Sequence, residues 1–180
     1  MKSRTALISL CVATLLSVLA YQLWQSNVLQ QAPDITLVTT RGERIALSDL
    51  RGKPLLVTFW ATTCTTCMEE MPSLIDLYRE LSPHGLNVIG IAIFYDPPNR
   101  VLAVQASRDI PYIIALDIDA QASRAFGDVR LTPTTFLIGP DGRVVYRKVG
   151  AMEMDKVRGE ILEMLGAAHS PQAVSTGSGS

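Results

Sequence analysis

The chain has 180 residues, of which 48% are hydrophobic and 18% charged, and its 16 basic residues nearly balance its 17 acidic ones. That length suffices for one domain of ordinary size with short appendages, but not for two full hydrophobic cores. Because the basic residues form no concentrated patch, we do not expect a nucleic-acid partner.

The first residues predict a membrane segment. Lys2 and Arg4 precede an uncharged and mostly apolar run, Thr5–Trp24, which as a helix at about 1.5 Å per residue would span roughly 30 Å. Positive charges before the run predict that residues 1–4 stay in the cytoplasm and that the rest of the chain is exported. A signal peptide cleaved near Ala20 is the alternative. We favour the uncleaved anchor, because the apolar character continues past Ala20 to Trp24.

Strand and helix signals alternate after a polar linker at residues 25–33. Continuous β-branched and aromatic runs are typical of strands buried on both faces, and apolar residues at helical spacing predict the helices between them. The expected elements are a hairpin over 35–47, a helical turn at 48–52, a strand over 54–60, a helix from 64 to 84 kinked near Pro72, a strand over 87–94, a helix over 100–109, a strand over 112–116, a helix over 119–127, a hairpin of 134–138 with 143–149, and a helix over 154–165. This order predicts an α/β domain over residues 34–168, with a mostly parallel, mixed central sheet and helices on both faces. Residues 169–180 form a small, polar tail.

Cys64 and Cys67 are the only cysteines outside the apolar run, so the exported part cannot build a disulfide framework. Two intervening residues on the first turn of a helix allow two sulfurs to come within the disulfide distance of about 2.05 Å. At a helix N-terminus the pKa of a thiol falls below its usual value, because the helix dipole favours the thiolate. We therefore predict that Cys64 attacks substrate disulfides and that Cys67 resolves the mixed disulfide.

Metal binding is the main alternative for this pair. A structural zinc ion needs four ligands, and the chain offers no second CxxC, only His84 and His169. Met68 and Met71 lie beside the cysteines and are soft ligands that suit copper. Helical spacing places Met71 in the core and Met68 at the surface near a peptide groove. We expect neither a metal nor another small cofactor.

A further indication of redox chemistry lies far along the chain, where Thr132-Pro133 directly precedes a predicted strand. Only X-Pro bonds adopt the cis form cheaply, and a cis Pro133 would lie over the thiols. Three features of the sequence are similar to motifs of the thioredoxin superfamily: the segment "FWATTCTTCMEEMP", the later "TPTTFLIGPDG", which begins with this dipeptide, and Gly150. The chain specifically resembles the membrane-anchored TlpA/ResA/DsbE-type branch of that superfamily. The resemblance covers about residues 32–165.

The resemblance implies a thioredoxin-like fold with an N-terminal hairpin extension. It implies that Cys64 and Cys67 are the redox pair and that Trp60 packs beneath them. It also implies that Pro133 is cis and that Thr132 offers its backbone to an incoming peptide.

The resemblance also places an acidic residue at Glu70, one helical turn beyond Cys67. At that spacing Glu70 can accept the proton of Cys67. Glu69 and Glu70 also suit the first turns of a helix simply because they complement its dipole, so a purely structural role stays open.

Several positions depart from the family pattern. Thr63 stands where tryptophan is frequent, Thr65-Thr66 replaces a proline-containing dipeptide, and Thr58 occupies a position where many thioredoxins bury an aspartate. Hydroxyls of Thr63, Thr65 or Thr66 could stabilise the Cys64 thiolate and so raise the reduction potential.

The function implied is that of a monomeric thiol:disulfide oxidoreductase, tethered to the inner membrane with its catalytic domain in the periplasm. The resemblance implies a reductant role towards exported thiol proteins such as apocytochrome c, with electrons from a membrane donor of the DsbD/CcdA kind. A copper- or zinc-binding accessory protein and a non-catalytic peptide-binding module are the alternatives. A peroxidase is disfavoured, because no Pro-x-x-x-Thr-x-x-Cys pattern precedes either thiol.

Overall fold

The computed structural model describes residues 14, 15, 17 and 31–169. In the N-terminal segment the described residues are helical, and the Ser17 hydroxyl donates to the Thr14 carbonyl (2.9 Å). The rest of the predicted anchor, most of the linker and the tail from residue 170 lie outside the described residues. In the part of the chain that the structure describes, no helix is both long and apolar enough to cross a membrane.

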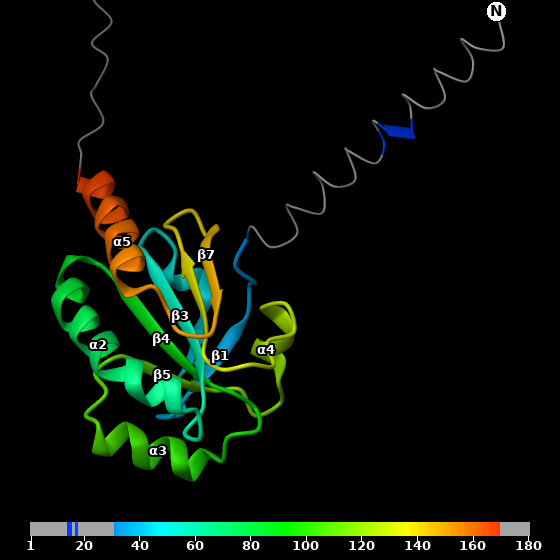
Figure 1. Ribbon diagram of the computed structural model, residues 1–180, viewed down its shortest axis with the longest axis vertical. Coiled ribbons are helices and arrows are strands. Elements are labelled where there is room, and N and C mark those ends of the chain that lie inside the picture. Colours follow the sequence, from blue (N-terminus) through cyan, green and yellow to red (C-terminus); the bar gives the residue numbers. More distant parts are fainter. Residues whose placement is uncertain (1–13, 16, 18–30, 170–180) are drawn as a thin grey trace, which may run out of the picture. The chain divides into compact units, whose positions relative to one another are not determined.

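One mixed sheet forms the centre of the domain from Ala32 onward (Figure 1). Its central strand β3 (Leu55–Trp60) is buried along its whole length, as its continuous apolar sequence predicts. It runs parallel to β4 and antiparallel to β6. The sheet order is β2-β1-β5-β4-β3-β6-β7, with the other strands being β1 (Thr36–Thr39), β2 (Arg44–Ala46), β4 (Asn87–Ala92), β5 (Ile113–Leu116), β6 (Thr134–Ile138) and β7 (Val144–Val149).

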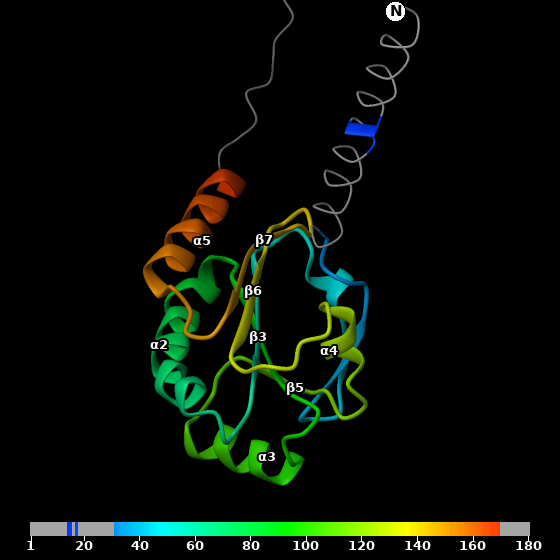
Figure 2. The same cartoon turned by 45° about the vertical axis from the view of Figure 1, so that its right-hand side comes forward.

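Alternate residues of β3 face two separate halves of the core. Leu56 and Trp60 pack with α2 (Thr65–Leu81) and α5 (Met154–His169). The side chains of the opposite set, Val57 and Phe59 among them, lie in the core on the other face of the sheet. That face is covered by α4 (Gln121–Ala125) and the short helix η1 (Leu47–Leu50), and Figure 2 shows α2 and α5 on one side of β3 and α4 on the other. The predicted α/β fold with helices on both faces is confirmed. The prediction of a mostly parallel sheet is wrong for the described residues, because β3–β4 and β4–β5 are the parallel pairs and the other four pairings are antiparallel.

Several element boundaries differ from the prediction; α4, predicted over 119–127, is shorter (Gln121–Ala125), and three other differences have a local cause. The strand predicted over 87–94 ends at Ala92, because the chain turns there and the Asp96 N–H donates to the Ile93 carbonyl (2.9 Å). The next helix, α3 (Pro98–Ser107), begins two residues early, since proline is well accommodated in a first helical turn. The last helix runs past the predicted end at residue 165 to His169, because alanines at 167 and 168 favour helix.

Pro72 lies inside α2, which nevertheless extends from Thr65 to Leu81; a further one-turn helix, η2 (Ser82–His84), follows it. Proline has no N–H, so the carbonyl four residues earlier loses its helical partner. That carbonyl belongs to Met68, and it accepts a hydrogen bond from Nη1 of Arg108 instead (3.1 Å). An arginine from beyond α3 thus compensates for the proline one turn after the cysteines.

Candidate active site

Cys64 and Cys67 lie where β3 gives way to α2. Cys64 is the N-cap residue of α2, and its Sγ accepts a hydrogen bond from the Cys67 N–H (3.1 Å). The two sulfurs form a disulfide, with an S–S distance of 2.12 Å and Cα atoms 5.2 Å apart. The structure is therefore the oxidised form of the pair.

The two cysteines differ in accessibility. Cys64 is partly exposed, whereas Cys67 is buried with 5% of its surface exposed. The Cys67 N–H and the dipole of α2 both favour negative charge on the Cys64 sulfur once the disulfide is reduced. This asymmetry agrees with the predicted roles of attacking and resolving thiol.

Pro133 is joined to Thr132 by a cis peptide bond, as the sequence predicts. Its carbonyl accepts a hydrogen bond from the Gly150 N–H (2.8 Å), which ties it to the loop after β7. The main-chain groups of Thr132 make no backbone hydrogen bond within the described part of the chain.

A small cavity of about 20 Å³ brings most of the predicted site residues together. Trp60 is buried and lines this cavity together with Cys67. The full lining is Thr58, Trp60, Cys67, Glu70, Met71, Leu74, Tyr112, Pro133 and Met152. Of the six predicted site residues, Cys64 and Thr132 do not line the cavity.

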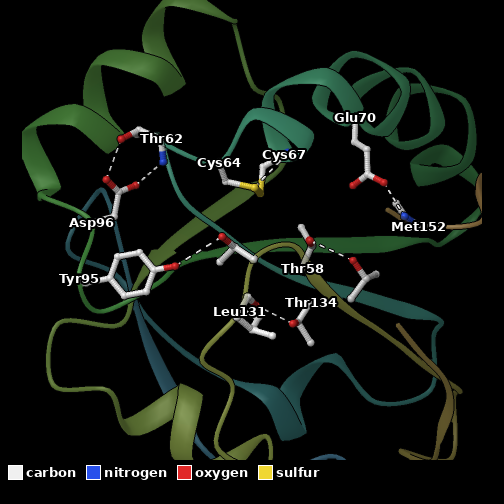
Figure 3. The surroundings of a disulfide bond; sticks show 12 residues. Thr58, Thr62, Cys64, Cys67, Glu70, Tyr95, Asp96, Leu131, Thr134 and Met152 are labelled. Atoms are coloured by element: carbon white, nitrogen blue, oxygen red, sulfur yellow. Dashed lines mark hydrogen bonds between the residues drawn. A yellow bond between two sulfur atoms is a disulfide. The ribbon is translucent and has the colours of Figure 1, made fainter. Parts of the chain in front are cut away.

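Glu70 points from α2 towards the loop after β7, where its carboxylate accepts a hydrogen bond from the Met152 N–H (Figure 3). Burial raises the pKa of Glu70 above its usual value, and the Met152 hydrogen bond opposes this shift only in part. A carboxyl group with a raised pKa, on the same cavity as Cys67, is suited to exchange a proton with that thiol.

Comparisons with known proteins agree with this geometry. A family model described as Redoxin matches residues 28–162. The chain belongs to the Redoxin family. It is 36% identical to the thiol-disulfide oxidoreductase ResA of Bacillus subtilis over 121 residues, which cover 67% of this chain and 66% of that protein. The ResA of Bacillus cereus is 29% identical over 133 residues, covering 72% of this chain and 74% of the relative.

A solved structure supports the same assignment. The thiol:disulfide interchange protein of the thioredoxin family from Chlorobium tepidum TLS superposes with a TM-score of 0.69 at 26% identity, covering 76% of this chain and 97% of the other. The resemblance to the TlpA/ResA/DsbE-type branch is thereby confirmed. This Redoxin-family chain is a thiol-disulfide oxidoreductase, with Cys64 and Cys67 as its disulfide.

Two buried hydroxyl groups face each other in the core near the disulfide. Thr58 and Thr135 face each other across β3 and β6, and their Oγ1 atoms lie 3.1 Å apart. Both residues are buried, and Thr58 lines the cavity beneath the disulfide. The pair thus places neutral, mutually hydrogen-bonded polar groups in the core next to this cavity.

In the disulfide form, the hydrogen bond that Cys64 Sγ accepts within the described residues comes from the Cys67 N–H. Thr63 and Thr65 are exposed, and Thr66 is partly exposed. Their predicted contact with the Cys64 thiolate concerns the reduced form and stays a prediction. Met71 is buried and Met68 partly exposed, as expected. Among the described residues, no group of three or more His, Cys, Asp or Glu side chains is placed to hold a metal ion.

Sequence reasoning missed a hydrogen-bonded link between two loops of this Redoxin domain. Asp96 is buried, and its carboxylate accepts hydrogen bonds from both the N–H (2.6 Å) and the hydroxyl (2.7 Å) of Thr62 (Figure 3). Because β3 and β4 are parallel, their carboxyl ends meet at one edge of the sheet. An aspartate shortly after a buried strand was therefore the feature of the sequence that could have indicated this link. Tyr95 was missed too, and its hydroxyl lies 3.5 Å from the Thr132 hydroxyl.

Proposed function

We propose that this protein is a membrane-tethered disulfide reductant for exported proteins, with the thiol groups of Cys64 and Cys67 as its electron carriers. The observation that carries the proposal is the asymmetry of the pair: an accessible sulfur at the start of α2 and a shielded sulfur one turn behind it. No small cofactor takes part in the cycle.

The cycle begins with the reduced pair. The Cys64 thiolate attacks one sulfur of a substrate disulfide, the substrate S–S bond breaks, and a mixed disulfide forms while the first substrate thiolate leaves. Cys67 then loses its proton and attacks the Cys64 sulfur. The mixed disulfide breaks, the second substrate thiolate leaves, and the Cys64–Cys67 disulfide of the present structure forms. Two electrons have passed to the substrate.

Glu70 is proposed to accept the proton that Cys67 loses. Its pKa is raised by burial, so its affinity for a proton is greater than that of an exposed carboxyl group. Thr132 is proposed to hold the substrate segment through its main chain, since its backbone groups make no backbone bond in the part of the chain described. Both roles were implied by the family resemblance.

The site of action is proposed from the sequence of the N-terminal segment. Positive charges at Lys2 and Arg4 before the apolar run Thr5–Trp24 support an inner-membrane anchor with the catalytic domain in the periplasm. A reductant in an oxidising compartment needs electrons from across the membrane, so a DsbD/CcdA-type donor is the proposed partner. Apocytochrome c and other exported thiol proteins are the proposed substrates.

The reduction potential of the Cys64/Cys67 pair tests the direction of electron flow. Equilibration of the full-length chain with thiol–disulfide buffers is expected to give about −250 mV or lower, and a value near −120 mV would identify an oxidant instead. The roles of the thiols are tested by trapping. Cys67→Ser is expected to accumulate a mixed disulfide with substrate, and Cys64→Ser, its matched control, is not.

Localisation needs a separate measurement. In spheroplasts, a membrane-impermeant thiol reagent added after reduction is expected to label Cys64 of the wild type. The Cys64→Ser variant controls for labelling of other thiols. Labelling that requires lysis of the spheroplasts would contradict a periplasmic catalytic domain.

A further inference from the structure

Three large side chains are exposed on the two loops that flank the disulfide. Leu131 is 64% exposed, directly before Thr132, and Phe94 and Tyr95 are 44% and 49% exposed in the loop after β4. We name Phe94, Tyr95 and Leu131 the apolar rim. Single exposed apolar residues are ordinary, but a group of them beside a reactive centre marks a binding surface.

The aromatic part of the rim is held in place. Asp96, the next residue after Tyr95, is bound by two hydrogen bonds to Thr62, which precedes Cys64 by two residues. The two aromatic rings pack edge to face, with centroids 5.3 Å apart. Since the loop is anchored to the segment that carries the cysteines, these rings are exposed without being free to move away. A preorganised surface loses little entropy when a ligand binds.

The two halves of the rim are joined next to the disulfide. The Tyr95 hydroxyl lies 3.5 Å from the hydroxyl of Thr132, so the loop after β4 contacts the cis-proline loop that carries Leu131. Figure 3 shows Tyr95, Leu131 and Cys64 around this one region of the molecule. A polypeptide whose sulfur reaches Cys64 therefore passes the rim.

The charges beside the rim disfavour an anionic ligand. The Asp96 carboxylate lies directly behind it, and the neighbouring cation Arg130 is paired with Asp128 (2.6 Å). Phe94 also lines a hollow of about 40 Å³ with apolar residues such as Ile118, which is 72% exposed. Two buried carboxylates, Asp96 and Asp117, also line this hollow and repel an anion. The surface suits an uncharged, apolar side chain.

We propose that the apolar rim selects the substrate of this enzyme: an extended polypeptide segment with a large, uncharged apolar side chain next to its disulfide-bonded cysteine. The proposal rests on the function proposed above and adds the chemical class of the substrate. Such side chains are buried in folded proteins, so the rim directs the enzyme to unfolded exported chains. Glutathione disulfide, which is anionic and lacks an apolar side chain, is a poor substrate.

Three peptides test the proposal on the reduced full-length chain. Each contains one cysteine in a mixed disulfide with thionitrobenzoate, and the residue before the cysteine is Leu, Ser or Glu. The Cys64 thiolate attacks the peptide sulfur, the S–S bond to thionitrobenzoate breaks, and the coloured thiolate is released. The leucine peptide is expected to react about tenfold faster than the serine peptide, because partial burial of one leucine side chain is worth about that factor. The glutamate peptide is expected to be slowest.

The variants Leu131→Ser and Phe94→Ser are expected to lower the leucine-to-serine rate ratio to below threefold. A ratio cancels any general change in thiol reactivity. Leu162→Ser, the same change at an exposed leucine of α5, is the matched control and keeps the wild-type ratio. Tyr95→Phe keeps the ring and removes the hydroxyl contact with Thr132, so it retains most of the selectivity.

Each outcome decides between the proposals. Equal rates for the leucine and serine peptides in the wild type, or an unchanged ratio in both rim variants, would overturn the apolar rim while leaving the reductase function intact. Release of thionitrobenzoate from none of the peptides would instead contradict the proposed function itself.

Discussion

Gly90 lies in the middle of β4, opposite Thr58 of β3 and on the face of the sheet that packs against α2. A methyl group built there would lie 2.8 Å from Cδ1 of Ile114, 3.1 Å from the indole nitrogen of Trp60 and 3.3 Å from Cε2 of Tyr112. All three side chains are buried, so none can move into solvent. Gly90→Ala therefore forces a rearrangement directly beneath the disulfide.

The magnitude follows from two opposing terms. Overpacking of a core by one methyl group costs about 1–3 kcal/mol. Replacing a strand glycine by alanine returns about 0.5–1 kcal/mol, because glycine loses more backbone entropy on folding. The expected net destabilisation is about 1–2 kcal/mol, or a melting temperature lower by roughly 2–8 °C for a domain of this size.

Urea unfolding followed by far-UV circular dichroism measures this difference on the oxidised protein. The control is Gly159→Ala in α5, where nothing lies within 4 Å of the new methyl group. Alanine in an exposed helix interior is expected to stabilise by about 0.8–1 kcal/mol. The same chemical change thus has opposite signs at the two sites. A Gly90→Ala protein at least as stable as the wild type would refute the tight packing of Trp60 against β4.

Further outcomes follow from the hydrogen bonds of the site. Asp96→Asn offers Thr62 one good acceptor in place of two and is expected to lower the free energy of unfolding by about 1–3 kcal/mol; an unchanged urea midpoint would contradict the link. Thr58→Val and Thr135→Val each leave a buried hydroxyl without its partner, so in urea unfolding the double variant is expected to lose less stability than the two single losses added together. Burial raises the pKa of Glu70, so the folded state binds its proton more tightly than the unfolded state does. Stability from this group is present at low pH and lost as the pH rises from 4.5 through the folded pKa. Glu70→Gln should abolish that part of the pH dependence in urea titrations of the oxidised protein, and an unchanged profile would show that Glu70 does not titrate there.

The sheet could be predicted from the sequence because its central strands are long, mostly apolar segments. β3 is a continuous run of aliphatic, β-branched and aromatic residues, β4 is mostly aliphatic, and α2 between them has apolar residues at helical spacing. The cysteine spacing and the X-Pro dipeptide before β6 then indicated where the redox site lies. Local patterns of this kind depend on neighbours in the chain, so they can be read without knowledge of the tertiary structure.

Contacts between loops could not be predicted in the same way. The partner of Glu70 is a backbone N–H eighty-two residues away, and no side-chain type at Met152 signals it. The link between Asp96 and Thr62 depends on the turn that ends β4 at Ala92, two residues before the apolar run itself ends. In both cases the register of the strands brings the carboxylate and its N–H donor together.

Sheet register also explains why all these groups meet at one place. The parallel strands β3 and β4 both end at the same edge of the sheet, which positions the cysteine loop beside the loop of Asp96. β6 is antiparallel to β3 and begins opposite Phe59, so Pro133 enters at that edge. β7 pairs Val149 with Thr134 and therefore also ends there, which brings the loop with Met152 to Glu70. A single edge of the sheet thus brings together the two cysteines, Pro133, the proposed proton acceptor Glu70 and the apolar rim.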